Sequence, residues 1–154
     1  MNAKTIILKN IDFYNNNFDF SSESYQGGFL NIESNSFFSS NCTFKKGLGS
    51  TGSAVSITSS DSQASYSFVS CEFEDLIALV SGAAVYISGV LKAANLTFES
   101  CNFNSIASNY GAVVHVSFSV NQLESPNYSI FPTLTMISCN STHVYASSGG
   151  LIYA

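Results

Sequence analysis

Apolar and polar residues alternate with a period of two in short runs along this chain, and the phase of the alternation changes between runs. Residues 96–99 (LTFE) alternate, and a new alternation starts at Cys101, directly after Ser100. Period two is typical of a β-strand with one buried face, and a change of phase indicates a corner in the chain. The three- and four-residue spacings of an amphipathic helix do not occur in these segments. The pattern therefore predicts short strands joined at corners.

Two short motifs recur at nearly constant spacing over the whole chain. The first surrounds a slot that is cysteine or isoleucine, in NIDF (10–13), NCTF (41–44), FVSCEF (68–73), FESCNF (98–103) and MISC (136–139). The second starts at a glycine, in GGFLNI, GSAVSI, GAAVYI, GAVVHV and GGLIYA. Successive cysteine slots lie 31, 29, 30 and 38 residues apart, and insertions fall in 15–25 and 120–132. Insertions confined to one connection per copy are typical of loops on a stacked repeat.

Each copy, of roughly 30 residues, contains three predicted strands. The corner between the first two strands is occupied by asparagine or serine, which turns favour. The third strand begins at the motif glycine and carries small and then branched apolar residues on one face. Five such copies predict an all-β chain that forms one domain over residues 1–154, a parallel β-helix of about five coils stacked about 4.8 Å apart. The corner residues are Asn10, Asn41, Ser70, Ser100 and Ser138.

Stacked coils place equivalent residues above one another, so the repeat also predicts columns in the core. The second copy departs from the pattern, because Ser39 takes the place of a large apolar residue and Phe38 comes one position early, which predicts a bulge. The cysteine slots give the column Ile11, Cys42, Cys71, Cys101 and Cys139, and an aromatic column beside it contains Phe13, Phe44, Phe73 and Phe103.

The alternation of an F-x-x-C-x-F segment with a GGAI-like segment resembles the repeats of right-handed β-helices in pectin-lyase-like proteins. It is similar in particular to repeats in the passenger regions of chlamydial polymorphic outer membrane proteins and in secreted repeat proteins of protists. The resemblance covers nearly the whole chain and implies a right-handed coil. Many pectin-lyase-like proteins cleave acidic polysaccharides, using a basic residue beside calcium-binding carboxylates or, in related hydrolases, clustered aspartates.

The catalytic groups of those enzymes are not gathered in this sequence, so we expect no enzyme activity. The chain has no arginine, its lysines share no slot with a carboxylate cluster, and its aspartates are isolated. The densest acidic group, at Glu72, Glu74 and Asp75, is expected to be an outward polar edge. His115 and His143 fall in different slots, and no G-x-S-x-G motif occurs. We expect no catalytic, metal or cofactor site.

Composition excludes several classes of partner and state. A net charge of −5 without arginine cannot build a phosphate-neutralising surface, so nucleic acid is excluded as a partner. Hydrophobic residues at 45% with charged residues at only 10% argue against intrinsic disorder. No apolar run reaches the roughly 18 residues of a membrane-spanning helix, and the first residues show no signal peptide. Ser, Asn and Thr supply the polar surface, and in a stacked rod they avoid ladders of like charge.

The cysteines in one column leave two interpretations open. Zinc needs thiolates that converge on one point, which a column does not provide. Buried free thiols would fill a narrow core as small hydrophobic groups. Disulfides between neighbouring coils are the alternative, because such coils lie within the Cα range of about 4.4–6.8 Å, although parallel side chains disfavour the required torsion.

Four N-x-[ST] sequons are candidate glycosylation sites, although their number is what composition predicts by chance. The sequon at a corner and the one in the longest insertion are expected to be accessible. We expect glycans at some of the sites if the chain passes through a eukaryotic secretory pathway. The candidate residues are Asn41, Asn95, Asn127 and Asn140.

The residues two positions after each motif glycine are apolar, although alternation from the glycine places them outward. They predict an apolar stripe along one outer face, which is unusual for a solvated sheet. Either the insertion at 120–132 covers this stripe, or the stripe is a lateral contact with another chain. The next outward slot contains Tyr86, His115 and Tyr153. The stripe residues are Phe29, Ala54, Ala84, Val113 and Leu151.

Taken together, these features predict a structural extracellular or cell-surface repeat protein, adhesin-like or fibre-forming, without catalytic activity. Neither terminal copy carries a polar cap, so we expect an excerpt of a longer chain or a unit that stacks end to end. The expected partners are further copies, bound end to end or laterally, other surface proteins and glycans. The alternative is a carbohydrate-binding or polysaccharide-cleaving β-helix, which a row of exposed tyrosines or a groove of carboxylates would favour.

Overall fold

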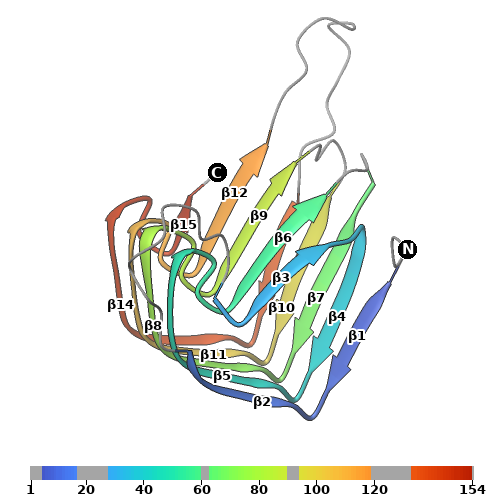
Figure 1. The fold of residues 1–154 in the computed structure, drawn as a ribbon, viewed down its shortest axis with the longest axis horizontal. Coiled ribbons are helices and arrows are strands. Elements are labelled where there is room, and N and C mark those ends of the chain that lie inside the picture. The colour runs from blue at the N-terminus through green and yellow to red at the C-terminus, as the bar shows by residue number, and fades with distance from the viewer. Residues whose placement is uncertain (1–4, 17–27, 60–62, 90–93, 119–132, 154) are drawn as a thin grey trace, which may run out of the picture.

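The computed structural model describes residues 5–16, 28–59, 63–89, 94–118 and 133–153, which form fifteen strands and no helix. The strands build three parallel sheets (Figure 1). Sheet A contains β1 (Ile6–Lys9), β4 (Ser36–Ser40), β7 (Ser65–Val69), β10 (Asn95–Glu99) and β13 (Thr133–Ile137). Sheet B contains β2 (Asp12–Asn16), β5 (Thr43–Thr51), β8 (Glu72–Ser81), β11 (Asn102–Tyr110) and β14 (Asn140–Ser148). Sheet C contains β3 (Leu30–Glu33), β6 (Val55–Ser59), β9 (Val85–Gly89), β12 (Val114–Phe118) and β15 (Ile152–Tyr153).

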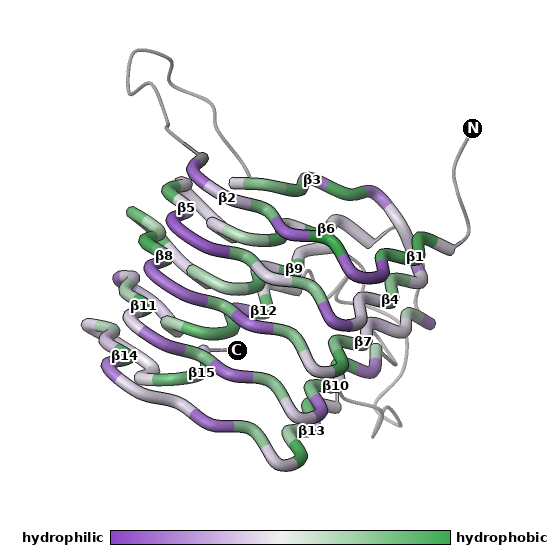
Figure 2. Tube along the Cα trace, turned by 90° about the horizontal axis from the view of Figure 1, so that it is seen from below, coloured by the Kyte–Doolittle hydropathy of each residue, from purple (hydrophilic) through white to green (hydrophobic). Residues whose placement is uncertain are grey.

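The chain contributes one strand to each sheet in turn and then repeats the circuit one level along. Each strand therefore pairs with the strand of the same sheet in the next coil, as in the order β1-β4-β7-β10-β13 of sheet A. Figure 2 shows residues of similar hydropathy recurring at the same place in successive coils. This arrangement confirms the predicted parallel β-helix of five coils with three strands per coil.

The corner between sheets A and B is formed by the predicted asparagine and serine residues. All five have a left-handed backbone, with φ between 50° and 55°. A left-handed conformation costs an ordinary residue about 1–2 kcal/mol, and short polar side chains tolerate it best. In the first two coils the corner side chains also bond to each other, since Asn41 Nδ2 donates to Asn10 Oδ1 at 3.3 Å.

A second left-handed corner lies inside the strands of sheet B, and the sequence pattern did not predict it. It divides each long strand into a base, before the corner, and an arm, after it. The arms of coils two to five are residues 47–51, 76–81, 106–110 and 144–148. The corner residues, with φ between 53° and 59°, are Asn15, Lys46, Asp75, Ser105 and His143.

The core between the sheets is built from the predicted columns. Phe44 stacks on Phe13 at 4.9 Å and on Phe73 at 5.1 Å, and Phe73 stacks on Phe103 at 5.1 Å, with the rings within 11° of parallel. Phe68 of sheet A meets Phe73 edge to face at 5.7 Å. Offset-stacked and edge-to-face pairs are the favoured aromatic geometries. The aromatic column therefore continues without a break from coil one to coil four.

The predicted bulge in the second coil is wrong. The register of β4 with β1 and with β7 is continuous, and Ser39 lies opposite Leu8 and Phe68. Ser39 is fully buried, and its Oγ lies 3.5 Å from Cys71 Sγ. Because the serine finds a polar contact in the core, the strand accommodates it in the inward slot without a shift of register.

Candidate interaction surfaces

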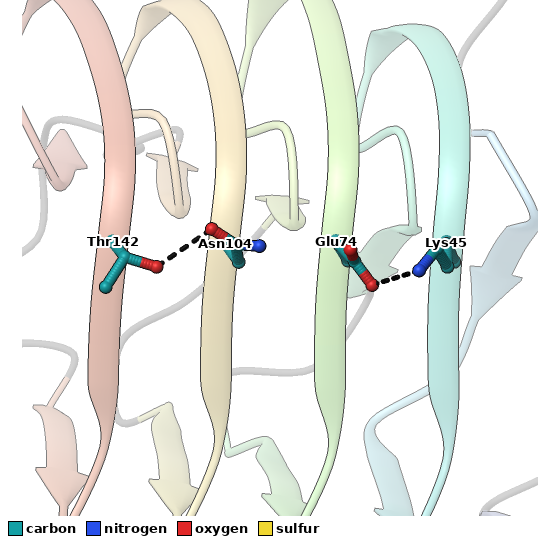
Figure 3. A network of polar contacts seen from close by, with 4 residues as sticks. All are labelled: Lys45, Glu74, Asn104 and Thr142. Atoms are coloured by element: carbon teal, nitrogen blue, oxygen red, sulfur yellow. Dashed lines mark hydrogen bonds and ion pairs between the residues drawn. The ribbon is translucent and has the colours of Figure 1, made fainter.

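The acidic group of coil three lies on the outer face of the sheet B base, as an outward edge. Glu74 forms an ion pair with Lys45 of the preceding coil (Figure 3), and this contact raises the pKa of Lys45. Glu72 is exposed, and Asp75 occupies the second corner. In the same column, Thr142 Oγ1 donates to Asn104 Oδ1 at 2.8 Å (Figure 3). In this column, polar contacts thus join coil two to coil three and coil four to coil five.

No candidate metal centre is found among the described residues, since no three His, Cys, Asp or Glu side chains converge there. His115 and His143 lie on different sheets, in β12 and β14. The same ranges contain no helix long and apolar enough to cross a membrane.

The cysteine column is present as predicted, and all of its thiols are free. Each thiol is near a carbonyl oxygen, for example Cys101 Sγ to Phe68 O at 3.4 Å and Cys139 Sγ to Phe98 O at 3.5 Å. The hydrogen bond between Cys71 and Cys101 lowers the pKa of the Cys71 thiol and raises that of Cys101, which burial raises further. With Cys42, Cys71 and Cys101 fully buried, the column serves as core packing.

Three of the four sequon asparagines lie on the surface. Asn41, Asn95 and Asn140 have exposed side chains, in the first corner, at the start of β10 and at the start of β14. Asn127 and the rest of the insertion 120–132 lie outside the described residues. Accessibility therefore permits glycosylation at the three described positions.

The predicted apolar stripe is wrong, because its residues face the core. Ala54, Ala84 and Val113 are fully buried, and Phe29 and Leu151 pack against the core cluster. The prediction counted the alternation from the motif glycine, but the strands of sheet C begin three residues later. The chain bends at the glycine, so in coils two to four the two residues before the sheet C strand are both buried, which explains why most of them are small.

A group of exposed apolar residues lies instead on the outer face of the sheet B arm. We define the outer strip as Leu48, Ile77, Ala107 and Tyr145, which form one column across coils two to five, together with Leu79 and Val80. Ile77 is 50% exposed and Tyr145 is 66% exposed. A register shift in β8 brings Leu79 and Val80 both to the surface, 46% and 45% exposed. The sequence signal for this strip was the run LIALV, whose alternation leaves every second apolar residue outward.

An aromatic ladder occupies the outer face of sheet C. The rings of Tyr86 and His115 lie 5.3 Å apart, and those of His115 and Tyr153 lie 5.0 Å apart. Tyr110 from the arm contacts Tyr153 at 5.3 Å, so the ladder adjoins the arm. Burial lowers the pKa of His115, and its Nδ1 is buried without a hydrogen-bond partner. Burial thus disfavours the charged form of the imidazole, which lies between two tyrosine rings.

Comparison with known proteins finds no match for this chain among protein-family models, curated proteins or solved structures. The architecture and surfaces described above are therefore the basis for a functional assignment.

Proposed function

We propose that this chain is a non-catalytic, structural rod of an extracellular or cell-surface repeat protein of the pectin-lyase-like type. The observation that carries the proposal is the continuous register of its columns. Phe44 and Phe73 stack on their neighbours at 4.9–5.1 Å, and each sheet runs through all five coils. A solenoid in which every coil contacts only its neighbours is a stiff, extendable rod.

The parallel pairing of the sheets supports this role, because the outer strand of a parallel sheet can pair with a further strand. Among the described residues, β1, β2 and β3 pair on one side only, and so do β13, β14 and β15. Inward residues there, such as Leu8 and Met136, are only partly buried. An open parallel edge accepts a further strand in the same register, which is how a rod or fibre extends.

The arrangement of the carboxylates supports a non-catalytic role. The retaining and inverting sugar hydrolases need two carboxyl groups that face one substrate bond. Here Glu74 forms an ion pair with Lys45, while Asp75 lies at the second left-handed corner. The resemblance to secreted repeat proteins favours an extracellular location, and the three exposed sequon asparagines are compatible with it.

Two measurements test the proposal directly. Electron microscopy of the native protein should show straight rods whose width is one coil cross-section or a small multiple of it. A sugar-release assay with pectate-like substrates should give no product. Product that disappears in the double variant Glu72→Gln, Asp75→Asn would overturn the structural assignment.

A second candidate function, carbohydrate binding, is favoured by one observation, the ladder of Tyr86, His115 and Tyr153 on sheet C. Aromatic side chains combine a large apolar surface with a polar group, which suits sugars. Titration with oligosaccharides, followed by NMR, should then perturb these rings, and Tyr86→Ala should abolish binding. Tyr14→Ala is the matched control, because Tyr14 is 55% exposed on sheet B, away from the ladder.

A further inference from the structure

The outer strip combines three properties that no other described face shares: it is apolar, exposed and free of charge. The arm residues 47–51, 76–81, 106–110 and 144–148 include no charged residue. Large side chains such as Ile77 and Tyr145 nevertheless have at least half of their surface exposed. Contiguous exposed apolar surface on a soluble protein usually marks an interaction site.

We propose that the outer strip is a lateral interface with a second copy of this chain, so that two rods pair side by side. The inference rests on the proposed structural function and identifies the partner of the rod as a second copy of the same chain. It places the lateral contact on the sheet B arm instead of the buried stripe on sheet C.

Charge favours a second copy as the occupant. The chain has a net charge of −5, so two copies repel each other over most of their surfaces. The described charges lie on sheets A and C, on the sheet B base and at the second corner, for example Glu33, Glu72 and Glu99. Contact along the uncharged arms lets two copies meet without burying a charge, which would be costly.

The period of the strip also favours a second copy. The strip presents one column residue per coil, and coils repeat about every 4.8 Å. A second copy presents the same residues at the same period, so side chains can interdigitate along the whole contact, as in packed sheets about 10 Å apart. A lipid surface or a partner without this repeat matches the column at isolated points only.

The sizes of the column residues specify how the copies meet. Leu48, Ile77, Ala107 and Tyr145 follow one another from coil two to coil five. A two-fold axis between coils three and four reverses the coil order of the partner. It sets Ile77 opposite the partner's Ala107 and Tyr145 opposite the partner's Leu48. Each larger side chain then meets a smaller one, in an isologous contact that closes as a dimer.

The test is sedimentation velocity over a range of concentrations, with thermal unfolding to check the fold. The wild type should pass from monomer to dimer as its concentration rises. Ile77→Lys should weaken the dimer at least about tenfold, because it buries an unpaired charge at the contact. Asn102→Lys is the matched control on the base of the sheet B strand β11, where the exposed side chain lies outside the strip, and it should dimerise like the wild type.

A charge pair tests the arrangement itself. Ala107→Glu alone should also weaken the dimer. A mixture of Ile77→Lys and Ala107→Glu copies should restore association as a heterodimer, because the lysine then faces the partner's glutamate and the other contact stays native. Restoration of this kind is not expected from a merely structural effect of either substitution.

The lateral interface would be overturned by a wild type that stays monomeric throughout, by a dimer that Ile77→Lys leaves unchanged, or by association with zwitterionic phosphatidylcholine vesicles in place of a dimer. Polymers that grow beyond a dimer and persist in Ile77→Lys would show end-to-end stacking alone, which overturns this inference and leaves the structural function in place. If the proposed structural function itself were wrong, the monomer would release sugar from pectate-like substrates.

Discussion

At the scale of single residues, left-handed corners determine where each coil turns. The first corner, between sheets A and B, is occupied by asparagine or serine, whereas the second contains Lys46, Asp75 and His143 in three of the coils. A third corner lies at the motif glycine before the sheet C strands, for example at Gly82, whose φ is 60°. The difference has a steric cause. A Cβ at Gly82 would lie 2.6 Å from Val85 O and 3.1 Å from His115 Cβ of the next coil. Only the third corner is closed to a side chain.

Gly82→Ala should therefore destabilise the fold by more than backbone conformation alone. Gly150→Ala is the matched control, because Gly150 has φ of 49° and nothing lies within 4 Å of its added Cβ. We expect a loss of about 1–2 kcal/mol at Gly150, from the left-handed conformation, and about 3 kcal/mol or more at Gly82. Urea unfolding of both variants measures the difference, and equal losses would contradict the steric account.

His115 gives the fold a specific dependence on pH. Burial lowers its pKa below the ordinary value of 6.5, so between these two values the unfolded chain binds more protons than the folded chain. The free energy of unfolding should thus decrease as the pH falls from about 6.5 through the folded-state pKa. His115→Gln should remove this part of the decrease in urea unfolding followed across pH, whereas His143→Gln, at an exposed position, should retain it.

At the scale of elements, the stacked aromatic column connects the sheets into one core. Phe73 is fully buried and contacts the rings of Phe44, Phe68, Phe98 and Phe103. A ring in the middle of the column thus has neighbours above, below and at its edge. Removing it leaves a cavity that several coils line at once.

Phe73→Ala should cost about 3–5 kcal/mol of stability, the usual range for a fully buried phenylalanine. Phe13→Ala removes the same group from coil one, where Phe13 is only partly buried, and should cost clearly less. Guanidinium unfolding compares the stability of the two variants, and the infrared amide I band or far-ultraviolet circular dichroism checks that each retains the β-helix. Similar costs would show that the end coil is as tightly packed as the middle.

The sequence pattern predicted the coils, the columns and the first corner because each repeats the same residue types at one slot. Cys71, Phe73 and Ser70 belong to such slots. The second corner was missed because its residues share no type, and only the three-residue step from Phe73 to Leu76 signalled it. The apolar stripe was misplaced because alternation holds within a strand and fails at a bend, where Ala83 and Ala84 are both buried.

At the scale of the whole molecule, the distribution of charge follows from stacking. Within the described part of the chain, no column places like charges on neighbouring coils, and Lys45 lies opposite Glu74. A like-charge pair directly opposite on neighbouring strands is destabilising. The low charge content is thus a requirement of a surface in which every residue lies next to its own equivalents.

Stability should also vary along the rod, because each coil is held only by its neighbours. Amide hydrogens of β7 and β10, which pair on both sides, should exchange most slowly. Those of β1 and of β14, which are paired on one side among the described strands, should exchange faster. Hydrogen exchange followed by mass spectrometry measures the gradient, and uniform protection would indicate that the edges are covered.

The parallel register has a further consequence for how such a molecule changes in evolution. Because the inward slots of one coil match those of the next, a duplicated coil can enter the stack without any change in cross-section. Each added unit lengthens the rod by about 4.8 Å, and each lost unit shortens it by the same step. The length of the rod is thus set by the number of its repeats. The outer strip and the aromatic ladder lengthen with it, because each added coil contributes one further position to both.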